Sequence, residues 1–430
     1  MEAGGTQPCP NCGASLPVVP PYLTWCHQCG WNVKAAPRPP LPAGRFDRLY
    51  EEAGRRVGQR LERELAAAET LEPRLTPSKA LAYAIAAGVH LSTLLLVAGG
   101  VVLIALFPTK IFAIAAGALM IAVAVLVRPR FGRVPDEDIV SRDAAPTLFR
   151  LFDRVAEAVG TKTVDILVVD DLYNAAWAIL GVRRKRVLRV GLPLIAALEP
   201  QERVGVVAHE LAHARNGDSS RGLFVGSAIR GLAHWYVVLA PHRTTGVNQP
   251  LYAPIGLAEK VANVFLWFLS RPPLLLFRVE VELLLQDGRR AEYLADAIAA
   301  RVAGSEAVVA THEKLLLESS FEQVVRQFSR PSNHGNESAV FDVVRSHLDA
   351  VPPRERERRR RVALLEDSTL GATHPPTGQR IRLLEQRPVH RAQVALTAAE
   401  SDEIDRELSG LRQRLGRRLV ENQRARLYQR

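Results

Sequence analysis

Two histidines and a glutamate stand in the spacing that a metal-dependent hydrolase uses: His209, Glu210 and His213. Pro200 suits the first turn of a helix, and apolar residues recur around the motif at helical spacing. Residues four apart lie on one face of a helix, so both imidazoles can bind one metal while Glu210 reaches a metal-bound water. A chance match on an amphipathic helix is the alternative, which the helical context disfavours. The spacing predicts a catalytic zinc with Glu210 as general base.

A catalytic zinc takes three protein ligands and keeps one open position. Asn216 and Ser219 stand where a metzincin has glycine and histidine, so that pattern is excluded. A carboxylate further along the chain is therefore expected, and the candidates by chemistry are Glu259, Glu280, Glu282 and Glu292. Only Glu292 has an aspartate four residues on, Asp296, which could support a zinc-bound histidine. Spacing alone leaves open the alternative of an exposed acidic face that balances the neighbouring arginines.

The four cysteines form two C-x-x-C pairs, which are separated by thirteen residues: Cys9, Cys12, Cys26 and Cys29. This spacing is typical of a four-thiolate structural zinc site, and the glycine after each pair permits the tight turn. About thirty residues cannot build a core of their own, so a metal would hold this segment together. Residues 1–31 are thus predicted to be a zinc ribbon, with two disulfides as the alternative. Ribbons bind protein or nucleic acid or cap a domain, and the sequence does not choose.

Two uncharged stretches, residues 81–107 and 111–127, each approach the length that crosses a hydrocarbon core. A buried soluble hairpin is the alternative. Arginines and lysine flank the pair on both sides, with one lysine in the turn, so the positive-inside rule places both ends in the cytoplasm. That compartment is reducing, which favours thiolates over disulfides in the ribbon. We therefore expect a multi-pass protein of the cell membrane with two transmembrane helices at 80–128.

Residues 222–240 and 261–277 are also apolar, but charges interrupt the first and Arg271-Pro272-Pro273 is expected to break the second. A charge at mid-bilayer is costly. Both are interpreted as helices on the membrane surface or in the domain core, with true spans as the alternative.

The remaining chain predicts a helical linker, a mixed domain and a C-terminal helix. Apolar spacing predicts an amphipathic helix at 46–65 within a linker at 32–79. Residues 135–390 are expected to form the catalytic domain, with a helix at 144–159 and strands at 164–169 and 186–190. Residues 391–430 are predicted to be one amphipathic helix that follows a capping box at Thr397 and Glu400 and that docks or self-associates. The net charge of +11 does not by itself choose a partner.

Three ordered signatures resemble those of the HtpX-like membrane metallopeptidases, which are related to the CAAX prenyl proteases. They are HELAHARNGD at 209–218, RRAEYLAD at 289–296 and THPPTGQRI at 373–381. The resemblance implies an α+β, mainly helical gluzincin-type domain with a small sheet, Glu292 as third zinc ligand and Asp296 as its supporting carboxylate. It also implies that His374 lies near the site. The family's Asn-Ala-Phe-Ala-like strand is replaced here by Asn174, Ala175, Ala176 and Trp177, so the substrate cleft is expected to differ.

The function expected from this resemblance is a membrane-anchored zinc endopeptidase that cuts membrane or misfolded proteins on the cytoplasmic side. One zinc would be catalytic and one structural, and an extended peptide would pair with the strand at 174–178. The ribbon could recruit a protein partner, whereas nucleic acid is not expected. The alternative is an inert membrane adaptor that uses the ribbon for binding, which the intact Glu210 disfavours.

Overall fold

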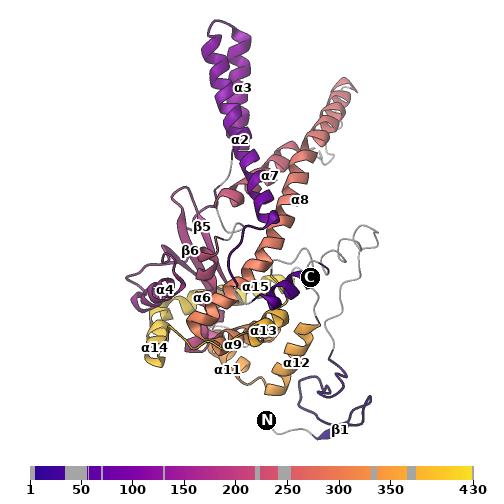
Figure 1. The fold of residues 1–430 in the computed structure, drawn as a ribbon, viewed down its shortest axis with the longest axis vertical. Helices are drawn as coiled ribbons and strands as arrows, with labels where there is room; N and C mark the ends of the chain where they lie inside the picture. Colours follow the sequence, from indigo (N-terminus) through magenta and orange to yellow (C-terminus); the bar gives the residue numbers. More distant parts are fainter. Residues whose placement is uncertain are drawn as a thin grey trace.

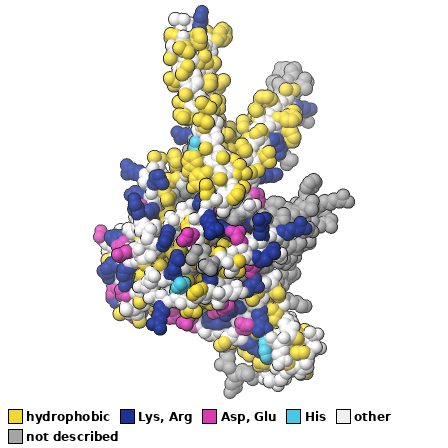
Figure 2. Space-filling view, in the orientation of Figure 1, with side chains coloured by type: hydrophobic (Ala, Val, Ile, Leu, Met, Phe, Trp, Pro, Cys, Tyr) yellow, Lys and Arg dark blue, Asp and Glu magenta, His cyan; other side chains and the backbone are white. Residues whose placement is uncertain are grey.

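Two helical rods project from one side of a body of helices and strands, and a small N-terminal unit lies at the opposite end (Figure 1). The structure is a computed structural model, which describes residues 5–33, 56, 58–68, 71–128, 131–217, 223–240, 253–330, 337–365 and 374–428. Hydrophobic side chains cover both rods, whereas charged side chains gather over the body (Figure 2). The apolar stretches of the sequence therefore lie mainly outside the body.

A four-stranded sheet has the order β3-β4-β6-β5. Its strands are β3 (Ile139–Val140), β4 (Ile166–Asp170), β5 (Ala175–Leu180) and β6 (Lys185–Gly191). β4 and β6 are parallel, and the edge strands β3 and β5 each pair antiparallel with their neighbour. The two predicted strands are confirmed to within two residues. The strand at 174–178 lies at the edge of the sheet, as a peptide-binding strand must.

The catalytic region is mainly helical, as predicted. Its helices are α4 (Pro146–Val159), α5 (Leu192–Ala197), α6 (Pro200–Arg215), α7 (Leu223–Leu239), α8 (Ala253–Ala303), α9 (Ser305–Leu315), α10 (Glu318–Phe328), the 3₁₀ turn η2 (Glu337–Ala339), α11 (Val340–Asp349), α12 (Pro353–Leu364) and α13 (Thr377–Glu385). The helix predicted at 144–159 is confirmed as α4, which ends at Gly160 in the left-handed conformation.

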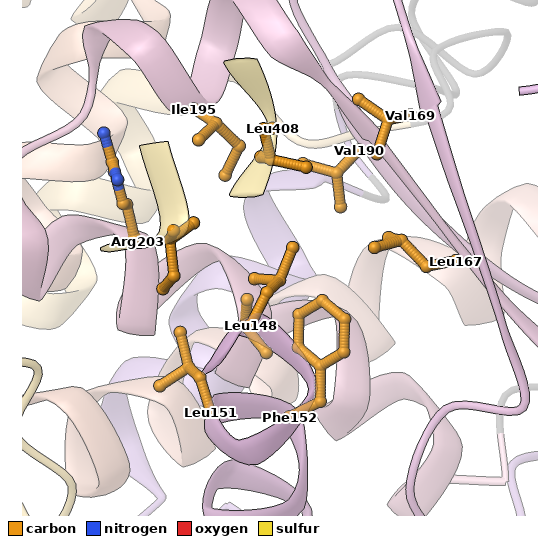
Figure 3. A pocket seen from close by; sticks show the side chains of 11 residues that line it. Leu148, Leu151, Phe152, Leu167, Val169, Val190, Ile195, Arg203 and Leu408 are labelled. Carbon is orange, nitrogen blue, oxygen red and sulfur yellow. The ribbon is translucent and has the colours of Figure 1, made fainter. Parts of the chain in front are cut away.

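The core lies where α4, the sheet and α6 meet. Apolar side chains such as Phe152, Leu167 and Val190 converge there around a small gap, and Arg203 of α6 borders it (Figure 3). Arg203 is buried and pairs with Asp405 at 2.9 Å between Nη2 and Oδ1, so the C-terminal region is joined to α6 by an ion pair.

The C-terminal region forms two helices, α14 (Ala398–Glu407) and α15 (Ser409–Tyr428), so the prediction of a single helix is wrong. The chain leaves the helix at Leu408 because Ser409 and Gly410 that follow are weak helix formers. The capping box of Thr397 and Glu400 is confirmed. Ile404 of α14 and Leu415 and Leu419 of α15 are buried in the core of the catalytic region, so this segment docks onto it.

The first rod is a helical hairpin of α2 (Pro77–Leu106) and α3 (Ile111–Val127) (Figure 1). The two helices approach closely where Gly100 meets Gly117, since a Cβ on either glycine would lie within 2.7 Å of the other's carbonyl oxygen. Among the described helices, α2 alone is both long and apolar enough to cross a membrane, and α3 and α7 are apolar but shorter.

The second rod is the outer half of α8, which continues through Pro272 and Pro273. The prediction that these prolines break the helix is wrong: each removes one helical hydrogen bond, but the turns on both sides continue the helix. Exposed apolar side chains such as Phe265 and Phe268 line this half. The segment at 261–277 therefore lies outside the domain core, whereas α7 is partly buried against α2 and α8.

A short helix at 58–67 confirms the C-terminal part of the predicted linker helix; most of residues 46–57 lie outside the described part of the chain. Leu65 is buried against Tyr293 of α8 and Leu383 of α13. Arg290 also pairs with Glu64 at 2.8 Å between Nη1 and Oε1. The linker thus packs against the part of α8 that carries Glu292.

Candidate metal centre

Helix α6 presents His209 and His213 to a common point. It starts with Pro200 in its first turn, and Glu199 and Glu202 close its N-terminus as a capping box. The Nε2 atoms of the two histidines are 3.2 Å apart, as expected for residues one turn apart whose rings converge. His213 is fully buried. The predicted pair is thus brought together.

Glu292 of α8 completes the set. Its Oε2 lies 3.3 Å from Nε2 of His209, and its Oε1 lies 3.5 Å from Nε2 of His213. One ligand atom from each of the three residues lies within 4.8 Å of the others. Two imidazoles and a carboxylate are the donor set that a hydrolytic zinc takes, so the residues fit this metal.

The other candidate glutamates do not join this set. Glu280 precedes Glu292 by twelve residues on the same helix, about 18 Å along its axis. Glu282 is about 15 Å away by the same rise, and the side chain of Glu259 lies outside the described part of the chain. Glu292 is therefore the candidate that the fold places beside the histidines.

Asp296 lies one turn after Glu292 and contacts His209 from behind. Its Oδ1 is 3.0 Å from Nδ1 of His209, so the Nδ1–H can donate to the carboxylate and leave Nε2 for the metal. The same oxygen is 3.0 Å from Nε2 of His312 on α9. Asp296 therefore orients one ligand and joins α9 to the site.

Arg380 of α13 is a central residue to which the sequence analysis gave no role. Its Nε and Nη2 donate to the two oxygens of Asp296, each at 2.7 Å, and its Nη1 lies 3.2 Å from Oε2 of Glu292. Arg380 is buried, so its charge balances two buried carboxylates. Arg380 belongs to the signature at 373–381, and this was the only sequence pattern that could have pointed to its role. His312 lies in none of the three signatures, so no pattern in the sequence pointed to it.

His374 and Glu210 border the open side of the site. The side chain of His374 is 51% exposed, and its Nδ1 lies 3.0 Å from Oε1 of Glu292. Glu210 is buried and lines the same cleft as His209 and Glu292. This cleft encloses about 480 Å³, which is room for a peptide segment. His374 thus lies near the site, as expected, and Glu210 faces the space that a substrate would fill.

The carboxylates of the site are held in their ionised form, in which Glu292 can bind a metal cation. Burial disfavours charge on Glu292 and Asp296, but the Arg380 guanidinium holds the pKa of both carboxyls well below the usual range. Burial likewise opposes a charged His209, yet hydrogen bonds to Asp296 and Glu292 raise the pKa of this imidazole to about 9. A metal ion must displace that proton, so its binding releases a proton to solvent.

Strand β5 borders the cleft, and among the described residues no strand pairs with its outer edge. Gly191 donates to the carbonyl of Asn174 at 2.8 Å, so even-numbered β5 residues hydrogen-bond with β6 and odd-numbered ones point their backbone groups outward. Asn174 and Ala175 line the cleft. Ala176 is exposed on the opposite face and bonds towards β6, so this predicted substrate contact does not face the cleft.

The four cysteines converge into a second candidate metal centre. Their sulfur atoms all lie within 4.8 Å of one another, and none of the four is in a disulfide. The short strands β1 (Thr6–Pro8) and β2 (Ser15–Pro17) pair beside them. Gly13 and Gly30 have φ of 74° and 72°, the left-handed conformation that the tight turns require. The arrangement fits a tetrahedral zinc with four thiolates.

This N-terminal unit packs against α12 through Trp25. The guanidinium carbons of Arg354 and Arg361 lie 4.9 and 5.0 Å from the centre of the indole ring. Arg361 also donates to the carbonyl of His27 at 2.7 Å. Trp25 is buried between these two arginines, so the unit is attached to the catalytic region by cation–π contacts.

Comparisons with known proteins agree with this geometry. Residues 144–388, more than half of the chain, match peptidase family M48. The chain is 27% identical over 257 residues to a "Protease HtpX homolog" of Pyrococcus furiosus, which covers 58% of this chain and 75% of that relative. It is 25% identical over 223 residues to a "Protease HtpX" of Shewanella frigidimarina, with 50% and 71% covered. No solved structure matches the chain.

Proposed function

The chain belongs to peptidase family M48, as an HtpX-like protease, and from this membership we propose that it is a membrane-anchored zinc endopeptidase that cuts membrane or misfolded proteins on the cytoplasmic side. The observation that carries the proposal is the convergence of His209, His213 and Glu292 beside Glu210 in one cleft. Three ligands with an open side are the hallmark of a hydrolytic site rather than a structural one.

Zinc held by His209, His213 and Glu292 would polarise an attacking water and lower its pKa towards neutrality. Glu210 acts as general base: its carboxylate accepts the proton of the water and then passes it to the leaving amine. His374, beside Glu292 at the mouth of the cleft, donates a hydrogen bond to the oxyanion that develops on the substrate carbonyl. Asp296 keeps His209 in the tautomer that the metal needs.

The substrate lies extended along β5. The outward backbone groups of β5 form a free edge beside the cleft, and a peptide that adds to it gains main-chain hydrogen bonds without regard to its sequence. Asn174 and Ala175, at the start of this edge, border the ligands. Such binding suits an enzyme that cuts unfolded segments, because only an extended chain can pair in this way.

The two apolar rods support a membrane anchor. α2 is long enough to cross the bilayer, and α3 and the outer half of α8 extend the apolar surface on the same side of the body (Figure 2). The basic residues at the base of the hairpin support a cytoplasmic position of the body, by the positive-inside rule. The four cysteines would hold a structural zinc, which would stabilise the ribbon that is packed on α12.

Zinc content and cleavage can be measured together on the full chain in detergent. Wild type should hold two zinc ions and cleave casein. Glu292→Ala should hold one and cleave nothing, whereas Cys9→Ser/Cys12→Ser should hold one and retain the catalytic metal. If wild type holds a single zinc and cleaves nothing, the protein is an adaptor with an inert peptidase fold, the alternative function.

A further inference from the structure

We infer that a second, apolar pocket beside the zinc cleft takes a large apolar or aromatic side chain of the peptide substrate, about two to four residues from the bond that is cut. The inference rests on the proposed function and adds the class of substrate residue. The pocket encloses about 610 Å³ between β5, the end of α6, α7 and the base of α2. It is thus larger than the cleft of about 480 Å³ that holds the ligands.

The cleft and the apolar pocket lie next to each other, and successive residues of β5 and of α6 line first one and then the other. On β5, Ala175 lines the cleft, and Trp177 and Ile179 line the pocket. On α6, His209 lines the cleft and His213, one turn later, lines the pocket. Two residues of strand advance by about 6.6 Å and four residues of helix by about 6 Å, so both elements lead from one space into the next. A peptide on β5 must therefore pass from the cleft towards the pocket.

The backbone of β5 defines how far such a peptide can pair. Ala175, Trp177 and Ile179 point their backbone groups to the outer edge, and their side chains share one face. The amide of Ala175 donates to Oδ1 of Asn174 at 2.9 Å, so a peptide that pairs there must displace this bond. The amide of Gly181, next in this series, already donates to the carbonyl of Gly132 at 2.9 Å. The edge is closed at that point, so the pocket receives the last paired residues of the substrate.

Most of the side chains that line the pocket are apolar or aromatic, and Arg184, His90 and His213 are its charged or titratable members. Phe224 stacks on Tyr83 with ring centres 5.9 Å apart, and His90 fixes this pair by bonding the Phe224 carbonyl at 2.9 Å. Phe224 remains 44% exposed. The ring of Trp177 on β5 also lines the pocket and is itself mostly buried. An aromatic wall of this kind suits a large apolar or aromatic side chain.

The test uses the zinc-loaded full chain in detergent and fluorescence-quenched peptides. One series carries a single Phe, Leu, Ala or Glu that is moved along an otherwise fixed sequence, and mass spectrometry identifies the bond that is cut. For wild type, Phe or Leu should raise kcat/KM about tenfold over Ala at one position, two to four residues from the cut and on one side only. Absence of any such position in wild type would overturn the inference.

Two variants change the shape of the pocket in opposite directions. Phe224→Ala should abolish the preference for Phe, and Ile179→Trp, which narrows the pocket, should reverse it in favour of Ala. Phe268→Ala, an exposed phenylalanine on the outer half of α8, is the matched control and should behave as wild type. A preference that survives in both pocket variants contradicts the inference, and altered binding of a spin-labelled fatty acid in those variants would then assign the pocket to lipid.

A peptide of the same series that carries Ala at each of the varied positions separates this inference from the proposed function. If wild type and both pocket variants cleave it while Glu210→Gln does not, the peptidase is established and the variants are folded, whatever the preference shows. If wild type cleaves none of the peptides, both the function and the pocket assignment fail.

Discussion

Arg380 donates two hydrogen bonds of 2.7 Å to the carboxylate of Asp296, and both side chains are buried. The pair lies directly behind a metal ligand, since Asp296 also contacts Nδ1 of His209. A buried ion pair contributes less to net stability than its geometry suggests, because both charges lose their hydration. The main role of the pair is to hold side chains in position, because it fixes the carboxylate of Asp296 that orients His209. The positive charge of Arg380 also balances the negative charge of Glu292.

Removing the charge of Arg380 should destabilise the fold as well as the site. Arg380→Gln leaves Asp296 and Glu292 buried without their counter-charge, so we expect a loss of about 3–5 kcal/mol in the free energy of unfolding of the metal-free protein. Thermal unfolding in detergent with and without zinc measures this loss. Arg380→Lys keeps the charge but not the paired geometry and should lose less; equal losses would show that charge is not the cause.

Asp296→Asn should weaken zinc binding at the catalytic site about 10- to 100-fold, because the amide no longer fixes the tautomer of His209. Competition with a fluorescent zinc chelator gives the affinity of each site. The cysteine site should be unaffected in the same titration, and it serves as an internal reference. Unchanged affinity at both sites would mean that Asp296 does not orient the ligand.

Glu210→Gln should lower kcat by a factor of about 10² to 10⁴ while both zinc ions remain, since an amide cannot accept the proton of the attacking water. Glu318 lines the same cleft and offers a matched control. Glu318→Gln should retain activity within a few-fold. Loss of zinc in Glu210→Gln would instead assign this residue a structural role.

Trp25→Ala should release the ribbon from α12 without emptying its metal site, because the ring lies between Arg354 and Arg361 and each cation–π contact contributes about 0.5–2 kcal/mol. Hydrogen exchange should rise in α12 and in the ribbon. The ribbon zinc content should stay at one. Arg326→Ala, which removes an exposed arginine of α10, is a control that should leave exchange in α12 unchanged.

Glu202 gives stability an unusual dependence on pH. Burial raises the pKa of this carboxyl above its ordinary value of 4.5, so the folded chain holds the proton more tightly than the unfolded chain does. Its contribution is complete below 4.5 and decreases as pH rises through the folded pKa. Glu202→Gln preserves the capping box and removes this decrease. Urea unfolding at several pH values should show a flatter profile for the variant than for wild type.

The parts of the site that sequence could predict are those set by local geometry. Helical spacing alone places His209 and His213 on one face, and the C-x-x-C pairs with their glycines determine a compact thiolate cluster. Glu292 could not be chosen by spacing, because its approach depends on how α8 crosses α6. Arg380 and His312 were missed for the same reason: their partners lie far away in the chain.

The errors in the fold have local causes as well. Two adjacent prolines ordinarily end a helix, yet α8 continues through Pro272 and Pro273 because long helical segments lie on both sides. The leucine spacing at 404–419 suggested one helix, but Ser409 and Gly410 interrupt it. In α8 the flanking helical turns outweigh the helix-breaking tendency of two prolines. At Ser409 and Gly410, in contrast, low helix propensity outweighs the regular spacing of the leucines.

α8 carries its exposed apolar half and the ligand Glu292 on one uninterrupted helix. If the outer half of α8 lies in the bilayer up to Leu276, the sixteen residue steps from Leu276 to Glu292 place the metal site at most about 24 Å from the membrane surface. The length of this helical segment then limits the distance between the metal site and the membrane. At the full distance, about seven extended residues would separate the cut from the bilayer, so under the proposed function we predict that shorter loops of a membrane protein are cut poorly until the protein is drawn out of the membrane.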